Sequence, residues 1–126
     1  LAVLDIIEEE NLVSKSAEMG EYMTRRVLEM QRKHMMIGDV RGPGLFIGLD
    51  IVKDRQSKAQ DVDMAVKVTA IAREKGVIVG LGGSDGRPGI GNVIKLKPPM
   101  NIGKEEADRS LDLLDAAFEE ASKSAK

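Results

Sequence analysis

The sequence predicts an α+β fold, a small α/β sandwich in which helices pack on one face of a mostly antiparallel sheet of three or four strands. Two observations lead to this prediction. Long segments at both ends repeat apolar residues at spacings of three and four, which is typical of amphipathic helices. Between them, short apolar runs alternate with glycine-rich and proline-rich turns, which is typical of strands. The expected order of elements is α-α-β-β-α-β-β-α.

Composition limits the function classes. The 126 residues suit one domain, and 42% hydrophobic residues can supply its core. A net charge of −2 and an aromatic content of 2% offer neither the basic surface nor the stacking platforms of a nucleic-acid binder. No apolar run approaches the ~20 residues of a membrane helix. The absence of cysteine excludes thiolate metal sites and fits a reducing compartment, the cytoplasm or an organelle matrix.

The first third of the chain predicts two helices. Residues 1–10 carry a short apolar stripe, and Asn11 is expected to end this helix and to cap the next. A long helix follows, whose apolar face ends at His34, so we expect this histidine to pack rather than to bind a metal. Its basic and acidic residues between 25 and 33 are expected to face solvent. The chain begins within a helical pattern, and we therefore interpret it as a fragment whose upstream part is missing.

An antiparallel hairpin is predicted next. Residues 37–41 form a short strand, and Gly42-Pro43-Gly44 has strong turn chemistry. Residues 45–52 then alternate with period two, which is the signature of a half-buried strand. A second strand after the glycines also separates this stretch from a dinucleotide fingerprint, in which a helix would follow.

The second half predicts a helix, two strands and a final helix. A polar loop over 53–60 leads to Asp61, a candidate cap for the helix that Gly76 ends. The remaining expected elements are a strand at 77–79, a glycine-rich loop at 80–91, a strand at 93–96 and a helix at about 104–122.

Lys95 is the one candidate site residue. It lies within the strand VIKL, where alternation places Val93 and Lys95 on one face and Ile94 and Leu96 on the other. The pattern alone leaves two interpretations open: the ammonium meets solvent, or it meets an anion.

The stretches IGDVRGPGLFIGLDIVKDRQSK (37–58), VIVGLGGSDG (77–86) and NVIKLKPPMNIGKEEAD (92–108) resemble the C-terminal small domain of class III (subgroup II) aminotransferases. These stretches are most similar to the alanine–glyoxylate aminotransferase 2-like and dialkylglycine decarboxylase branch of the family. The resemblance implies that residues 1–34 comprise a helical connector from a missing large domain plus the first small-domain helix, and that residues 35–126 form the small domain.

The resemblance also implies a cofactor and partners. The complete protein would be a homodimer of fold type I that uses pyridoxal 5′-phosphate to move an amino group between an amino acid and a 2-oxoacid. The cofactor's lysine and its phosphate contacts would lie in the upstream large domain, so no residue of this chain is assigned to cofactor binding, and we expect the fragment alone to be inactive. The small domain would close over the substrate.

At the position of Lys95 the family carries an arginine that clamps the substrate carboxylate. Lysine offers a compact charge instead of a planar fork, so substrate preference could shift, transamination could weaken, or the role could differ. Arg41, Arg87 and Lys97 are further candidate cations. The alternative hypothesis is a stand-alone, non-catalytic α+β module that binds a partner or dimerises through its methionine-rich helix faces.

Overall fold

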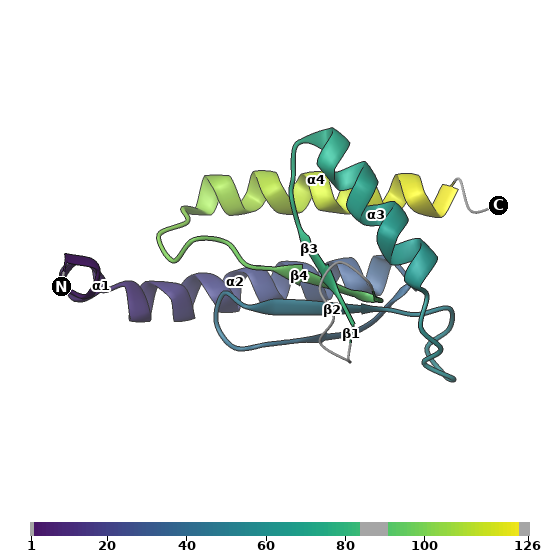
Figure 1. Ribbon diagram of the computed structural model, residues 1–126, viewed down its shortest axis with the longest axis horizontal. Coiled ribbons are helices and arrows are strands. Elements are labelled where there is room, and N and C mark those ends of the chain that lie inside the picture. The colour runs from purple at the N-terminus through teal and green to yellow at the C-terminus, as the bar shows by residue number, and fades with distance from the viewer. Residues whose placement is uncertain (1, 84–90, 124–126) are drawn as a thin grey trace.

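A computed structural model describes residues 2–83 and 91–123 (Figure 1). The elements follow the predicted order, and their bounds are α1 (Ala2–Glu9), α2 (Leu12–Lys33), β1 (Ile37–Arg41), β2 (Ile47–Ile51), α3 (Val62–Lys75), β3 (Gly80–Gly82), β4 (Val93–Leu96) and α4 (Lys104–Lys123). None of the helices in these two ranges is long and apolar enough to cross a membrane.

The strands form one antiparallel sheet in the order β1-β2-β4-β3. The predicted hairpin is confirmed, because β1 pairs directly with β2 around the proline-glycine turn. The central strands β2 and β4 are far apart in sequence but adjacent in the sheet, so the loop after β2, helix α3 and β3 all lie between them in the chain. The α+β class predicted from the sequence is confirmed.

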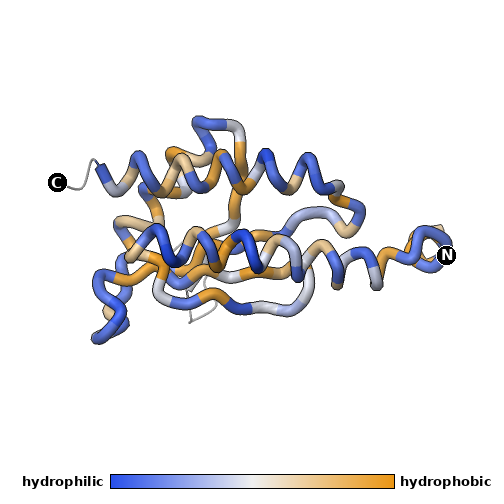
Figure 2. The backbone as a smooth tube through the Cα atoms, turned by 180° about the vertical axis from the view of Figure 1, so that it is seen from behind, coloured by the Kyte–Doolittle hydropathy of each residue, from blue (hydrophilic) through white to orange (hydrophobic). Residues whose placement is uncertain are grey.

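The core lies between the sheet and the helices. Ile47, Leu49 and Ile51 of β2 are fully buried, as the period-two pattern requires when one face is covered. Helices α2, α3 and α4 supply the other half of the core, with Phe118 of α4 fully buried at its centre. Figure 2 shows the strands as mainly hydrophobic segments beside helices along which hydrophobic and hydrophilic residues alternate. The core residues of α2, α3 and α4 thus pack on the sheet face that carries Ile47, Leu49 and Ile51, and none of the described helices supplies core residues to the opposite face.

The ends of α3 agree with the sequence, whereas the start of α2 does not. Asp61 accepts a hydrogen bond from the backbone N–H of Met64 at 3.0 Å, and Gly76 ends the helix in the left-handed region with φ of 105°. Asn11 does separate α1 from α2, but its side chain makes no capping bond. It turns the chain by adopting a left-handed φ of 54°, which asparagine tolerates better than most residues.

The strand predicted at 77–79 is wrong, since β3 is Gly80–Gly82. The backbone N–H of Val77 still bonds the carbonyl of Ala72 at the end of α3, so this residue belongs to the helix terminus. Ile78 is 81% exposed. Residues 77–79 therefore connect the end of α3 to the sheet, and the pairing of β3 with β4 begins at Gly80.

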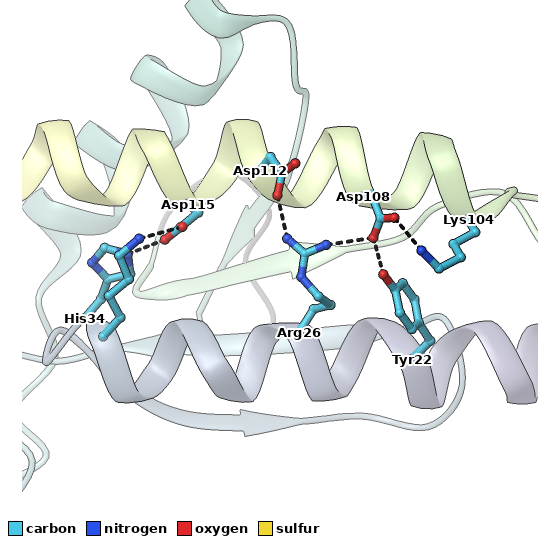
Figure 3. A network of polar contacts seen from close by, with 8 residues as sticks. Tyr22, Arg26, His34, Lys104, Asp108, Asp112 and Asp115 are labelled. Carbon is cyan, nitrogen blue, oxygen red and sulfur yellow. Dashed lines mark hydrogen bonds and ion pairs between the residues drawn. The ribbon is translucent and has the colours of Figure 1, made fainter.

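Helix α2 also lies alongside α4 and is joined to it by a row of polar contacts (Figure 3). Arg26 bonds Asp108 at 2.7 Å and Asp112 at 2.6 Å. Lys33 bonds Asp115 at 2.8 Å. The expectation that the charges between residues 25 and 33 face solvent is therefore wrong for Arg26, whose side chain is 23% exposed against the aspartates of α4. Lys33 is 53% exposed, as expected, although it also bonds Asp115.

Candidate functional site

The sheet face opposite the core carries Lys95 near its middle. The strand register aligns four residues across the sheet: Arg41 lies opposite Gly48, Gly48 opposite Lys95, and Lys95 opposite Gly80. The predicted faces of β4 are confirmed, because Ile94 and Leu96 lie in the core, with 0% and 7% exposure. Lys95 consequently projects from the opposite face. The residues paired with it on the two neighbouring strands are glycines, which have no side chains.

Lys95 has no hydrogen bond or ion pair with any residue in the ranges 2–83 and 91–123, and its side chain is half-buried. A Cβ built at Gly80 would lie 3.4 Å from the Cβ of Lys95, in ordinary van der Waals contact. The two flanking glycines thus leave open the space that neighbouring side chains fill in most strands. An ammonium in such a position is available to an anion from outside the domain.

Arg41 is committed to carboxylates. Its guanidinium donates to both oxygens of Asp50, at 2.8 and 2.9 Å, and to Asp39 at 3.0 Å. Hydrogen bonds to Asp50 and then to Asp39 raise the pKa of Arg41. The charge of Arg41 is therefore already balanced within the domain.

Of the other two candidate cations, the structure describes only Lys97. Lys97 is exposed at the end of β4, and its Nζ lies 5.7 Å from the centroid of the Phe46 ring in a cation–π contact. Arg87 lies outside the described residues. Lys95 therefore has the most central position of the three candidates that the structure describes.

Two hollows open on this sheet face. One has a volume of about 280 Å³ and is lined by Phe46, Gly48, Val93 and Lys95, among others. The other has a volume of about 430 Å³ and is lined by polar residues that include Asp50, Arg55 and Asn92.

The polar hollow contains a buried amide. Asn92 is 4% exposed, and its Nδ2 donates to the carbonyl of Ile51 at 3.2 Å. Its Oδ1 makes no hydrogen bond in the structure. The side chain joins the end of β2 to the start of β4, so its defined role is to hold these central strands together.

The described residues do not form a cradle for a phosphate-bearing cofactor. The glycine-rich phosphate-binding loops of nucleotide-binding proteins open a helix, but Gly42–Gly44 leads into β2 and Gly80–Gly82 is itself a strand. Within 2–83 and 91–123, no three histidine or carboxylate side chains lie close enough to hold a metal ion. The only histidine, His34, packs on the Phe118 ring with 5.4 Å between centroids, as its place in the apolar stripe predicts.

The sequence alone did not identify Phe46, Gly48 and Asn92 as part of this face. Gly48 gave the clearest available signal, because a glycine inside a period-two strand often marks the close approach of another group. Asn92 gave none, since its burial depends on the pairing of β2 with β4.

Together, these features define a small α+β domain with one helix-covered sheet face and one face that bears a lysine without a partner among the described residues. A family model for class III aminotransferases matches residues 1–118. The chain belongs to the class III aminotransferase family.

Several curated proteins are similar to the chain. Isoleucine 2-epimerase of Lentilactobacillus buchneri is 45% identical over 94% of this chain and 25% of its own length. Leucine/methionine racemase of Thermococcus litoralis is 42% identical, with the same two coverages of 94% and 25%. Alanine–glyoxylate aminotransferase 2 homolog 2, a mitochondrial protein of Arabidopsis thaliana, is 36% identical over 91% of this chain and 23% of its own length. The chain spans about a quarter of the length of these relatives.

Solved transaminases share the fold. A transaminase with L-alanine matches with a TM-score of 0.85 and 31% identity, over 98% of this chain and 28% of the solved one. An amine transaminase from an uncultivated Pseudomonas species, solved in its pyridoxal-phosphate-bound form, matches with a TM-score of 0.83 and 33% identity, over 95% and 26%. The family thus implies pyridoxal phosphate in full-length relatives.

Proposed function

We propose that this chain is the C-terminal small domain of a longer pyridoxal-phosphate enzyme that transfers an amino group between an amino acid and a 2-oxoacid. Residues 1–34 would connect it to the large domain and include its first helix, and residues 35–126 would form the domain proper. The observation that carries the proposal is the ammonium of Lys95, which has no partner among residues 2–83 and 91–123 and projects from the sheet face opposite the core.

Lys95 would bind the substrate carboxylate. A lysine is a point charge with three donors, so it attracts a carboxylate without fixing its plane as an arginine fork does. The position is well suited to this role, because the buried residues Ile94 and Leu96 anchor the strand on both sides. Arg41 is a weaker candidate, since Asp39 and Asp50 already occupy its donors.

Helix α1 supports the proposal of an upstream domain. None of its described residues is buried, and Val3, Leu4 and Ile6 are 69%, 57% and 47% exposed. A helix with an apolar stripe is stabilised by burying that stripe against another element. We infer that the large domain of the same protein covers it. Homodimer formation, closure of the small domain over the substrate, and a cytoplasmic or organelle-matrix location remain part of this proposal.

The cofactor would be held by the large domain, where it would act as the electron sink for chemistry at the substrate's Cα. The described part of this chain offers no cradle for it, so the chain alone is expected to be inactive. Mixing the isolated chain with pyridoxal phosphate and an amino acid should give no turnover and no absorbance from a protein-bound cofactor. Robust turnover by these 126 residues would contradict the proposal.

Substitutions at Lys95 in the complete protein test the site. Lys95→Met should lower kcat/KM for amino acids by roughly tenfold to a hundredfold, because about 1.4 kcal/mol of lost transition-state binding is a factor of ten. Lys95→Arg restores a cation with fork geometry and should recover activity with altered ratios between substrates. Lys97→Met removes a neighbouring charge from the exposed end of the same strand and is the matched control. If Lys95→Met and Lys97→Met have the same small effect, Lys95 does not bind substrate.

Two of the similar curated proteins, the isoleucine 2-epimerase and the leucine/methionine racemase, favour a second candidate function. Their names describe epimerisation and racemisation of amino acids, which invert the configuration at Cα. Lys95 could hold the carboxylate in the same way for this reaction. Incubating the complete protein with a single enantiomer, with and without a 2-oxoacid, separates the two. Appearance of the other enantiomer without any 2-oxoacid would favour racemisation, whereas dependence on the 2-oxoacid would favour amino transfer.

A further inference from the structure

We propose that the 280 Å³ hollow beside Lys95 is an apolar subsite for the substrate's side chain, and that Gly48 and Phe46 set its selectivity. The substrate class would be amino acids with a sizeable apolar side chain. This inference rests on the proposed function, because it takes Lys95 as the residue that binds the carboxylate.

The hollow is mainly carbon-lined apart from Lys95 and Arg41. Pro43, Phe46 and Val93 contribute apolar side chains, and Gly48 contributes bare backbone. The Phe46 side chain is 50% exposed. Its ring therefore has apolar surface available to a ligand.

Gly48 has no backbone reason to be glycine. Its φ is not in the left-handed region, and a Cβ there would meet Val93 Cγ1 at 3.5 Å and the carbonyl oxygen of Arg41 at 3.8 Å, both ordinary contacts. Glycine also weakens a strand interior relative to residues with side chains. The domain itself would accept alanine, so we attribute the glycine to the space that its missing side chain leaves in the hollow.

Charge indicates how a ligand would lie. Among the described residues, the cations that line the hollow are Arg41, which is balanced by Asp39 and Asp50, and Lys95, which has no described partner. The carboxylate is therefore drawn to the Lys95 side. A side chain on the adjacent carbon would then reach Gly48, the residue directly opposite Lys95 in the neighbouring strand. Strand spacing is about 4.8 Å, which is within reach of a branched aliphatic chain.

The test uses the complete protein and two carboxylates that lack an amino group and so do not react: acetate and 4-methylpentanoate. Isothermal titration calorimetry should give a Kd for 4-methylpentanoate at least about tenfold lower than for acetate, since each buried methylene strengthens binding severalfold. Gly48→Ala and Phe46→Ala should each reduce the ratio of the two Kd values to about threefold or less. Phe46→Ala alters a half-exposed side chain, so it remains informative if Gly48→Ala fails to fold.

Two controls separate the possible failures. Gly103→Ala adds the same methyl group where no other atom lies within 4 Å, and it should keep the full preference. Lys95→Met should weaken both carboxylates. If Gly48→Ala and Phe46→Ala leave the preference unchanged while Lys95→Met weakens both ligands, the subsite is wrong and the carboxylate site stands. If Lys95→Met changes neither affinity, or the parent protein binds neither ligand, both proposals fall.

Discussion

Nε2 of His34 lies 2.5 Å from Oδ1 of Asp115, so the buried end of α2 is tied to the middle of α4 by one short polar contact. An ionised carboxylate can only accept, which places the shared hydrogen on Nε2 of His34. The ring also stacks on Phe118 of the same helix. His34 therefore makes a polar contact and an apolar contact with α4. Losing His34 or Asp115 should weaken the packing of α2 against α4.

Asp115→Asn should destabilise the chain by about 1–3 kcal/mol, because the buried His34 ring and Lys33 would lose their charged acceptor. Urea unfolding followed by circular dichroism measures this. Asp112→Asn is the matched control on the same helix, because the Asp112 side chain is 70% exposed and its bond to Arg26 should contribute less than about 1 kcal/mol. Equal losses in the two variants would contradict the importance of the buried contact.

Acid should loosen the contact between α2 and α4. Hydrogen bonds from Tyr22 and Lys104 lower the pKa of Asp108. Burial raises the pKa of Asp115, but hydrogen bonds from Lys33 and His34 outweigh it, so the net shift is downward. A carboxyl group whose pKa is lower when folded stabilises the fold above its unfolded pKa, which is about 3.9.

The free energy of unfolding should therefore decrease as the pH falls below about 4, through the lowered pKa values of these two aspartates. Denaturant titrations between pH 7 and pH 2 measure the slope. The double variant Asp108→Asn/Asp115→Asn should lose part of this slope. An unchanged slope in the double variant would assign the acid sensitivity to other carboxylates.

Gly20→Ala should destabilise the chain, although alanine favours helices by about 1 kcal/mol over glycine. A Cβ at this position of α2 would lie 2.3 Å from the backbone carbon and oxygen of Gly44, so the helix or the turn before β2 must move. We expect a loss of roughly 1–3 kcal/mol, typical of overpacking. Gly103→Ala, which meets open space, should change the unfolding free energy by less than about 0.5 kcal/mol.

Substitutions on the apolar surface of α1 should affect the stability of the complete protein more than the stability of this chain alone. Leu4→Gln and Ile6→Gln should each change the stability of the 126-residue chain by less than about 0.5 kcal/mol, because both side chains are about half exposed. In the complete protein the same changes should lower the melting temperature by several degrees, if an upstream domain covers this stripe. Equal effects in the two contexts would contradict that docking.

The elements with strong local patterns could be predicted from the sequence. Alternation in β2 gave its buried face, and Asp61 and Gly76 gave both ends of α3, because pattern and caps act over a few neighbouring residues. The placement of β3 could not be predicted in this way. Its ladder depends on pairing with β4 across the sheet, which overrides the β-propensity of the residues around Ile78.

The candidate site was likewise only partly predictable from the sequence. Alternation in its strand placed Lys95 on the face opposite Ile94 and Leu96, but only the family resemblance favoured an anion over solvent as its partner. That Gly48 and Gly80 flank it follows from a register between strands separated by long stretches of sequence, and no single strand contains this information. The pairing of Arg26 with Asp108 was missed for a similar reason, because it depends on how α2 and α4 lie side by side.

β4 has only four residues, and those on either side of Lys95 are embedded in the interior. The tip of the lysine is therefore mechanically coupled to the hydrophobic layer beneath it. Adding or removing a methyl group among the buried residues under β4 would therefore shift the strand and, with it, the ammonium of Lys95. If Lys95 binds substrate as proposed, laboratory selection for new substrates should recover changes at interior aliphatic positions as well as on the proposed binding surface.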